Sequence, residues 1–150
     1  MPDYSNSKLD EMDNTCPLFT LENQIHKCKV VNIYDGDTIK VVFPVFGTHY
    51  RWNCRLAGVD TPEMRTHNDK EKAYATKARD ALREKILNKI IEIHCGKFDK
   101  YGRLLGDLYF ENKHINQWLI DEKYAFPYGG KTKKDWGEYL DELEKSGVRI

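Results

Sequence analysis

Hydrophobic and polar residues alternate with the two-residue period of β-strands in three successive segments of the chain. These segments cover residues 26–34, 37–43 and 49–56, and they are rich in β-branched and aromatic residues. The dipeptide Asp35-Gly36 separates the first two segments. It is a strong signal for a tight hairpin turn, because glycine accepts the positive φ of a primed turn. The pattern therefore predicts an antiparallel meander of three strands.

After an irregular stretch at 57–72, the period of the apolar residues changes to that of a helix. Ala75, Ala78, Leu82 and Ile86 recur at helical spacing, with charged residues on the opposite face. Strands and helices then follow in mixed order. We expect a helix at 73–88, strands at 90–95 and 104–110 joined by a turn at 99–103, a short helix at 113–122, a break at 125–130 and a last helix at 133–144.

Five strands with a helix after the third is the element order of an OB-fold, a partly open Greek-key barrel. The sequence thus predicts an α+β fold, namely a five-stranded OB-fold β-barrel with three helices. A chain of 150 residues is long enough for one hydrophobic core. We find no internal repeat, so we assign residues 25–150 to one domain.

Charged residues are distributed unevenly along the chain. The total of 24 basic and 24 acidic side chains gives a net charge of zero, which excludes a polybasic protein that binds nucleic acid or membranes by bulk charge. Residues 1–24, however, hold five acids and one base, whereas residues 25–150 hold 23 bases and 19 acids. The first segment lacks any structural period. We expect it to be an acidic, mostly disordered tail in front of a mildly basic domain.

The four cysteines stand far apart and include no Cys-x-x-Cys pair. A zinc site could be built from His26, Cys28, His94 and Cys95, but adjacent residues in a strand point to opposite faces and the spacing matches no usual zinc pattern. Buried free thiols are the favoured interpretation. Together with a polar N-terminus and no long apolar run, they predict no signal peptide, no membrane span and a reducing, intracellular compartment.

Four short polar stretches could carry chemistry, although each also has a structural explanation as a turn or a solvated group. Asp37 and Asp60, with the backbone carbonyl of Thr61, would make a hard oxygen site for Ca²⁺ or Mg²⁺. Arginines match the oxygens of a phosphate with their forked donors, and a further carboxylate can orient or deprotonate a water. Arg55, Arg103 and Glu63 supply these groups. The combination is what metal-assisted phosphodiester hydrolysis requires.

The same stretches carry a resemblance to a known family. The chain resembles the staphylococcal nuclease-like (thermonuclease) family through DGDT at 35–38, RLAGVDTPE at 55–63 and DKYGR at 99–103. These motifs stand in the family's order with near-family spacing. The resemblance runs from about Lys29 to about Tyr128, and the family fold is an OB-type barrel with three helices.

The resemblance implies a role for each matching position. Asp37 and Asp60 correspond to calcium-binding carboxylates and Thr61 to the carbonyl ligand, while Glu63 activates or positions the attacking water. Arg55 and Arg103 would stabilise the pentacoordinate phosphorus. Lys100 and Tyr101 match residues that hold a substrate phosphate, and Tyr128 lies where the family places an aromatic ring against a base. The implied activity is Ca²⁺-dependent cleavage of the 5′-oxygen–phosphorus bond of DNA or RNA, with single strands preferred, by a monomer.

The chain also departs from the family pattern. The stretch after Glu63 is slightly shorter and lacks the usual Gly-Pro before the helix. Two alternatives to the enzyme remain at this stage. One is a catalytically inactive OB-fold module that binds single-stranded nucleic acid or a protein partner, and the other is a structural role in a larger assembly. All six matching positions hold the expected residue, which favours the enzyme.

Overall fold

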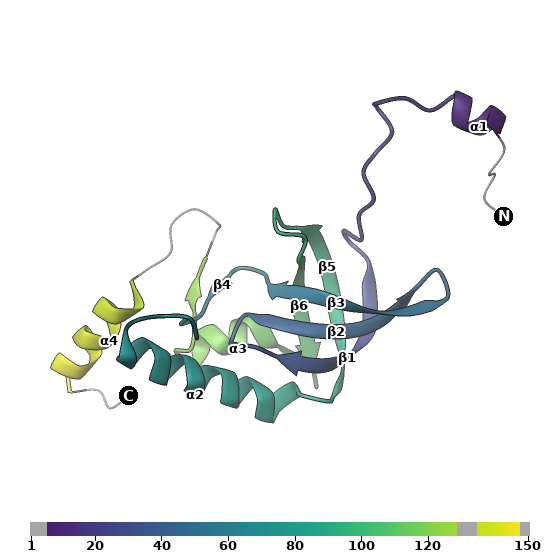
Figure 1. The fold of residues 1–150 in the computed structure, drawn as a ribbon. Helices are drawn as coiled ribbons and strands as arrows, with labels where there is room; N and C mark the ends of the chain where they lie inside the picture. Colours follow the sequence, from purple (N-terminus) through teal and green to yellow (C-terminus); the bar gives the residue numbers. More distant parts are fainter. Residues whose placement is uncertain (1–5, 129–134, 148–150) are drawn as a thin grey trace.

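The alternating segments pair into one strongly curved sheet in the computed structural model, which describes residues 6–128 and 135–147 (Figure 1). The sheet has the order β3-β2-β1-β5-β6-β7, and β3 also pairs in parallel with β6. This last pairing closes a five-stranded mixed barrel, so the predicted OB-type fold is confirmed. The strands are β1 (Ile25–Ile33), β2 (Thr38–Val45), β3 (Thr48–Leu56), β5 (Ile90–Phe98), β6 (Leu104–Phe110) and the short β7 (Lys113–His114).

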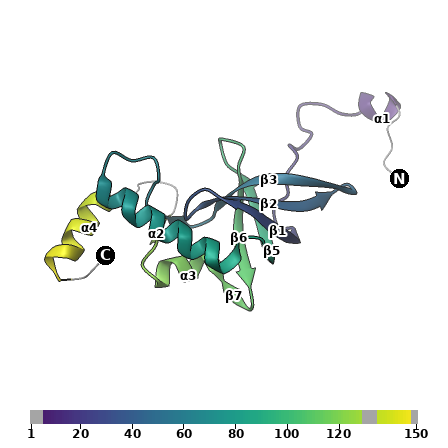
Figure 2. The ribbon, with the colours of Figure 1, turned by 60° about the horizontal axis from the view of Figure 1, so that its bottom comes forward.

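The three predicted helices pack around one end of the barrel. They are α2 (Asp69–Ile86), α3 (Ile115–Asp121) and α4 (Trp136–Lys145). Helix α2 runs below the barrel in Figure 1 and in front of it in Figure 2, and α4 lies beside the N-terminal part of α2. There, the Lys70 ammonium contacts carboxylates of α4 at 2.7 and 2.6 Å.

Helix α2 begins four residues before the predicted start at 73. Asn68 caps it, because its side-chain oxygen accepts from the backbone N–H of Glu71 at 2.9 Å. The apolar periodicity missed this first turn because its residues are charged. The predicted start of the last helix at 133, the end of the break at 125–130 and the first five residues of the tail lie outside the described residues.

The primed turn of the meander lies at a different place from the predicted one. Strands β2 and β3 continue through the expected loop and are joined by Phe46 and Gly47, whose φ values are 54° and 79°. Positive φ at both positions is the signature of a type I′ turn. In contrast, β1 and β2 are joined by four residues, 34–37, and Gly36 does not adopt a positive φ. A different constraint therefore acts on Gly36.

A two-stranded bridge that the sequence analysis did not predict joins the loop after β3 to the C-terminal part of the chain. Strand β4 (Val59–Asp60) pairs antiparallel with β8 (Phe126–Pro127), and Tyr128 donates its backbone N–H to the Gly58 carbonyl at 2.9 Å. The ring of Phe126 lies 4.4 Å from that of Trp136 in α4. A satellite aromatic cluster therefore connects this bridge to α4.

Apolar side chains from every barrel strand fill one core, which Leu82 and Ile86 of α2 and Ile115 and Leu119 of α3 close at the helical end. The buried polar side chain of Asn116 lies where α3 meets the barrel. Asn116 accepts from the Leu108 N–H at 3.0 Å and donates to the carbonyls of Ala57 and Gly106 at 2.9 and 3.0 Å. A buried amide satisfied in this way holds the loop after β3 against β6 and α3. The side chains of the barrel core are Cys28, Val30, Ile33, Ile39, Val41, Phe43, Cys54, Leu56, Ile91, Ile93, Cys95, Leu104 and Leu108.

The N-terminal segment extends away from the barrel and contains a short helix, α1 (Asn6–Asp10), that the sequence did not predict (Figure 1). Near the end of this segment, the side chain of Leu21 is fully buried and belongs to the barrel core. The division of the chain into a disordered tail and a domain at residue 25 stays a prediction. Within residues 6–128 and 135–147, none of the helices has the length and hydropathy needed to cross a membrane.

Three of the four free cysteines are buried, as expected, whereas Cys16 is exposed. Burial raises the pKa of the Cys28 thiol to about 12 and that of Cys95 to about 11, with the neighbouring Cys95 adding to the shift at Cys28. These buried thiols are therefore less readily ionised than exposed ones. In the described part of the chain, no three His, Cys, Asp or Glu side chains group at metal-binding spacing.

Candidate active site

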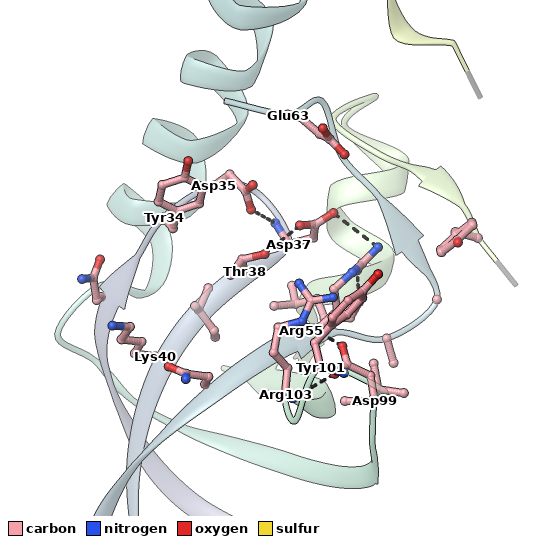
Figure 3. Close-up of a pocket in the computed structure, with 18 of the residues that line it drawn as sticks. Tyr34, Asp35, Asp37, Thr38, Lys40, Arg55, Glu63, Asp99, Tyr101 and Arg103 are labelled. Atoms are coloured by element: carbon pink, nitrogen blue, oxygen red, sulfur yellow. Dashed lines mark hydrogen bonds and ion pairs between the residues drawn. The ribbon is translucent and has the colours of Figure 1, made fainter. Parts of the chain in front are cut away.

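A pocket of about 970 Å³ opens on the barrel surface between β1–β3, the loop after β4 and the turn between β5 and β6 (Figure 3). Seven of the nine residues predicted for the site line this pocket. The other two, Asp60 and Thr61, are buried, and the Thr61 backbone N–H contacts Asp37. The seven lining residues are Asp37, Arg55, Glu63, Lys100, Tyr101, Arg103 and Tyr128.

Asp37 stands at the centre of the pocket, at the start of β2. One carboxylate oxygen accepts from the Thr38 hydroxyl at 3.1 Å, and the other accepts from the Thr61 backbone N–H at 3.3 Å. The second contact joins residues from two motifs that are 24 positions apart in sequence. It explains Gly36, because a Cβ there would lie 2.9 Å from Cγ2 of the buried Thr61. Glycine therefore permits the close approach of the two loops rather than a positive φ.

Asp35 is a further acidic residue of the pocket, which the sequence analysis treated only as part of a turn. Its side chain is 7% exposed, and Oδ1 accepts from the Asp37 backbone N–H at 3.1 Å. Burial, and secondly the negative charge of Asp37, raise the pKa of Asp35 to about 7. Crowding of buried carboxylates in this way is typical of functional sites rather than of turns. An Asp at both ends of the Gly36 turn is the sequence signal that could have identified it.

Arg55 reaches this acidic centre from β3. Its two terminal nitrogens donate to the backbone carbonyls of Leu56 at 2.7 Å and Val59 at 2.8 Å, and Nη2 lies 3.5 Å from Oδ2 of Asp37. The guanidinium also lies over the ring of Tyr128, 5.8 Å from its centroid. Since a guanidinium carries five N–H donors, these contacts orient it and leave donors for a ligand. The carbonyl contacts fix its direction, and Tyr128 lies beside it in the pocket.

Arg103 ends the turn directly before β6, the strand that pairs with β3 with Leu104 opposite Cys54. The Asp99 carboxylate organises its turn by accepting from the backbone N–H groups of Tyr101 and Arg103, both at 2.9 Å, and from Nε of Arg103 at 2.8 Å. Partial burial acts to raise the pKa of Asp99, but these hydrogen bonds outweigh it and hold the pKa below its usual value. Asp99 therefore stays ionised and holds Arg103 at the edge of the pocket.

Glu63 lies in the loop between β4 and α2, and its exposed side chain lines the pocket. The first turn of α2 holds this loop. Glu71 accepts from the Glu63 backbone N–H at 3.0 Å with one carboxylate oxygen and from the Thr66 hydroxyl at 3.2 Å with the other. A glutamate at this helical position often reaches back to the backbone of the cap residue. Here it positions the loop that carries Glu63, a role that the spacing alone does not reveal.

The donor set around Asp37 suits a hard divalent cation. Asp37 and Asp60 are carboxylates that are both more than nine-tenths buried, and Thr61 contributes a carbonyl. The Thr61 hydroxyl oxygen is also buried, and it has no hydrogen-bond partner among the described residues. Oxygen ligands from a few residues, completed by water, are what Ca²⁺ and Mg²⁺ take. Two carboxylates and a carbonyl are a sparse set, so much of the coordination shell would be water.

Comparison with known proteins decides the relationship. The sequence pattern of the family described as staphylococcal nuclease homologue matches residues 53–147. The chain belongs to the staphylococcal nuclease family. The matched range contains Arg55, Asp60, Glu63 and Arg103 but begins after Asp37.

Individual relatives are similar over a larger part of the chain than the family pattern. Endonuclease YncB of Bacillus subtilis is 32% identical over 133 residues, which cover 81% of this chain and 61% of that protein. The thermonuclease of Staphylococcus hyicus is 27% identical over 124 residues, covering 81% and 71%. A probable endonuclease of Schizosaccharomyces pombe is 27% identical over 150 residues, covering 77% and 65%. The chain thus spans about three-fifths of the length of YncB.

Within this family's fold, the loop after Glu63 depends on Glu71 in a way that can be tested. If the chain hydrolyses phosphodiester bonds, Glu71→Ala should lower kcat about tenfold, because loss of two hydrogen bonds of about 1 kcal/mol each frees the loop that holds Glu63. KM should change less than twofold, since Glu71 touches no substrate. Steady-state kinetics on single-stranded DNA measures both constants.

Two companion variants sharpen this test. Glu71→Gln keeps one acceptor oxygen and should recover part of the lost kcat, and Glu84→Ala changes an exposed glutamate farther along α2 as a matched control. A loss of kcat that is equal in Glu71→Ala and Glu84→Ala would contradict the positioning role.

Proposed function

We propose that this chain is a Ca²⁺-dependent nuclease that hydrolyses phosphodiester bonds of DNA and RNA with low sequence specificity and leaves 3′-phosphate ends. The observation that carries the proposal is the meeting of opposed charges in one pocket. Asp37 and Glu63 line it together with Arg55 and Arg103, and the buried Asp60 directly precedes Thr61, whose backbone N–H contacts Asp37. A carboxylate cluster alone would repel a phosphodiester, and arginines alone would only bind it. Their combination suits a reaction in which a phosphate gains negative charge.

Asp37, Asp60 and the Thr61 carbonyl would hold the cation. When bound, Ca²⁺ would neutralise charge on the phosphate and act as a Lewis acid; Mg²⁺ is a second candidate for the same oxygen donors. The described residues that line the pocket include no histidine or cysteine, the ligands that would favour zinc. The preference for Ca²⁺ rests on the family resemblance rather than on the geometry.

The chain's own residues would perform the remaining work. Glu63 would orient the attacking water and accept its proton as the oxygen bonds to phosphorus. Arg55 and Arg103 would donate to the phosphate oxygens as charge builds on them. The bond to the 5′ oxygen would then break, and that oxygen would take a proton from solvent water, giving a 5′ hydroxyl and a 3′ phosphate. Arg55 is well suited to this task, because its contacts with the Leu56 and Val59 carbonyls hold it in place before substrate arrives.

Lys100, Tyr101 and Tyr128 would bind the substrate next to the reacting phosphate. Tyr101 is 71% exposed, and the Lys100 ammonium lies 5.2 Å from its ring centroid. An exposed ring beside a cation can stack on an unpaired base while the cation contacts a phosphate. This arrangement supports a preference for single strands. We further propose that the protein acts as a monomer in a reducing, intracellular compartment, in keeping with its buried free thiols.

The test is a cleavage assay with single-stranded DNA and RNA in the presence of Ca²⁺ or Mg²⁺. Wild-type protein should degrade both polymers, and Glu63→Gln should lose most of this activity. Binding without cleavage under every condition would instead identify a catalytically inactive OB-fold module that binds single strands. If the protein neither binds nor cleaves nucleic acid, the remaining candidates are binding to a protein partner and a structural role.

A further inference from the structure

The pocket extends beyond the predicted catalytic groups. In Figure 3, Tyr34 and Lys40 lie on one side of Asp37, whereas Tyr101 and Arg103 lie on the other. The pocket lining includes both sides. Any phosphodiester substrate longer than one nucleotide continues in both directions from its reacting phosphate. Tyr34, Lys40 and Arg65 line the second side of the pocket. Neither the motifs nor the family resemblance assigns a ligand to this side.

The floor of this second side is a polar row across three strands. Lys40 of β2 stands opposite Asn32 of β1 and opposite Asn53 of β3 in the register of the sheet. All three residues line the pocket. The Lys40–Asn53 pair lies two positions along the sheet from the Thr38–Arg55 pair and therefore on the same face as the predicted site. A cation between two amides is a surface that can donate several hydrogen bonds to phosphate and sugar oxygens.

The Tyr34 ring forms the wall of this second side, and the Arg65 guanidinium lies next to it. Tyr34 directly precedes the Asp35–Asp37 turn and is 44% exposed. The Arg65 guanidinium carbon lies 6.0 Å from the centroid of its ring. Arg65 comes from the loop after Glu63, so the two sides of this contact belong to the two loops that also carry Asp37 and Glu63. In the described part of the chain, no carboxylate lies within ion-pair distance of Arg65 or Lys40.

We infer that Tyr34, Arg65 and Lys40 form a second nucleotide subsite, which binds the nucleotide on the side of the scissile phosphate away from Tyr101. The Tyr34 ring stacks on an unpaired base, and the two cations contact the adjoining backbone phosphate. Every base presents a π-face, so the subsite selects single strands without selecting a sequence. The inference rests on the proposed nuclease function. It adds a second base-binding position to the pocket.

Three dinucleotides test the stacking role, because each has one phosphodiester bond and so only one cleavage register. The first carries thymine on both sides of the bond, and each of the other two lacks one of the bases. We expect Tyr34→Ala to lower kcat/KM about tenfold on the complete dinucleotide. The same factor should persist when the base near Tyr101 is missing, but it should disappear when the base on the Tyr34 side is missing.

Tyr50→Ala is the matched control for this experiment. Tyr50 is 48% exposed on the same meander, in β3, and does not line the pocket. It should leave kcat/KM within twofold on all three dinucleotides. If Tyr34→Ala lowers kcat/KM by one common factor on all three, Tyr34 supports the catalytic loop and is no base-binding residue. No loss on the complete dinucleotide would overturn the inference as well.

Binding without cleavage tests the two cations separately. Fluorescence anisotropy of labelled dodecathymidylate in EDTA gives the affinity as a function of salt. The slope of log affinity against log salt should become shallower by about 0.7 in Arg65→Gln and in Lys40→Gln, the value for one lost contact to a single strand. Lys29→Gln, at an exposed position on β1 outside the pocket, should leave the slope unchanged. Slopes equal to that of Lys29→Gln would contradict the subsite.

The two hypotheses fail in different ways. If wild-type protein cleaves no dinucleotide or polymer but the salt slopes fall as expected, the nuclease function is wrong and the subsite stands. If wild-type protein cleaves and Tyr34→Ala shows the same factor on all three dinucleotides, the nuclease function stands and the subsite is wrong.

Discussion

Replacing Arg55 by lysine is expected to lower kcat/KM for cleavage of single-stranded DNA about 10²–10³-fold, the typical effect of removing one donor that stabilises transition-state charge. Lysine keeps the positive charge but lacks the planar fork of donors. It cannot contact the Leu56 and Val59 carbonyls with two separate nitrogens while also pointing at a phosphate. Steady-state kinetics with saturating Ca²⁺ measures the effect.

The control for this variant must separate chemistry from folding, because Arg55 is 7% exposed and its loss also leaves backbone carbonyls without a donor. The expected destabilisation is about 1–3 kcal/mol, which thermal unfolding can quantify. Arg51→Lys changes an exposed arginine of the same strand and should alter neither property. A folded Arg55→Lys protein that keeps a third of the wild-type kcat/KM would exclude the proposed role.

Removal of divalent cations is expected to have the largest effect. Excess EDTA should lower the cleavage rate at least about 10³-fold, because charge neutralisation by a metal typically contributes several kcal/mol in the transition state. In this pocket the loss is amplified because Asp35, Asp37 and Asp60 are each more than nine-tenths buried, so their negative charge opposes the phosphate more strongly once the metal is removed. The rate should return when Ca²⁺ is added beyond the EDTA concentration.

A titration of the cleavage rate against free Ca²⁺ locates the cation. Asp37→Asn should require a higher Ca²⁺ concentration for half-maximal rate, whereas Asp107→Asn, which removes the partner of His114 outside the pocket, should not. A full cleavage rate in EDTA would show that the carboxylates have another role. Unfolding curves in EDTA confirm that the protein stays folded during the measurement.

The barrel and most of the site were predictable because each depends on a local pattern. Strand alternation and the change of period at α2 identify the elements, and short motifs place Asp37, Arg55 and Arg103 on them. The barrel then brings the motifs together, since β3 lies between β2 and β6. Local patterns were sufficient here because the strands are seven residues or longer.

Features that depend on tertiary contact could not be predicted in the same way. The two-residue strands β4 and β8 are too short to show a period. The turn containing Gly36 was assigned to positive φ, although its constraint is the Thr61 side chain far along the chain. Asn116 and Glu71 carry ordinary sequence signals, and their bonds appear only when loops distant in sequence pack against them.

The β4–β8 bridge has a consequence for synthesis of the protein on the ribosome. Asp60 belongs to β4, but its strand partner is Phe126, and the adjoining Gly58 carbonyl receives the N–H of Tyr128. The neighbourhood of Asp60 therefore cannot be completed until residues 126–128 have emerged, which follow the last of the three motifs in the chain. We expect nascent chains to acquire the barrel strands progressively and the finished pocket last.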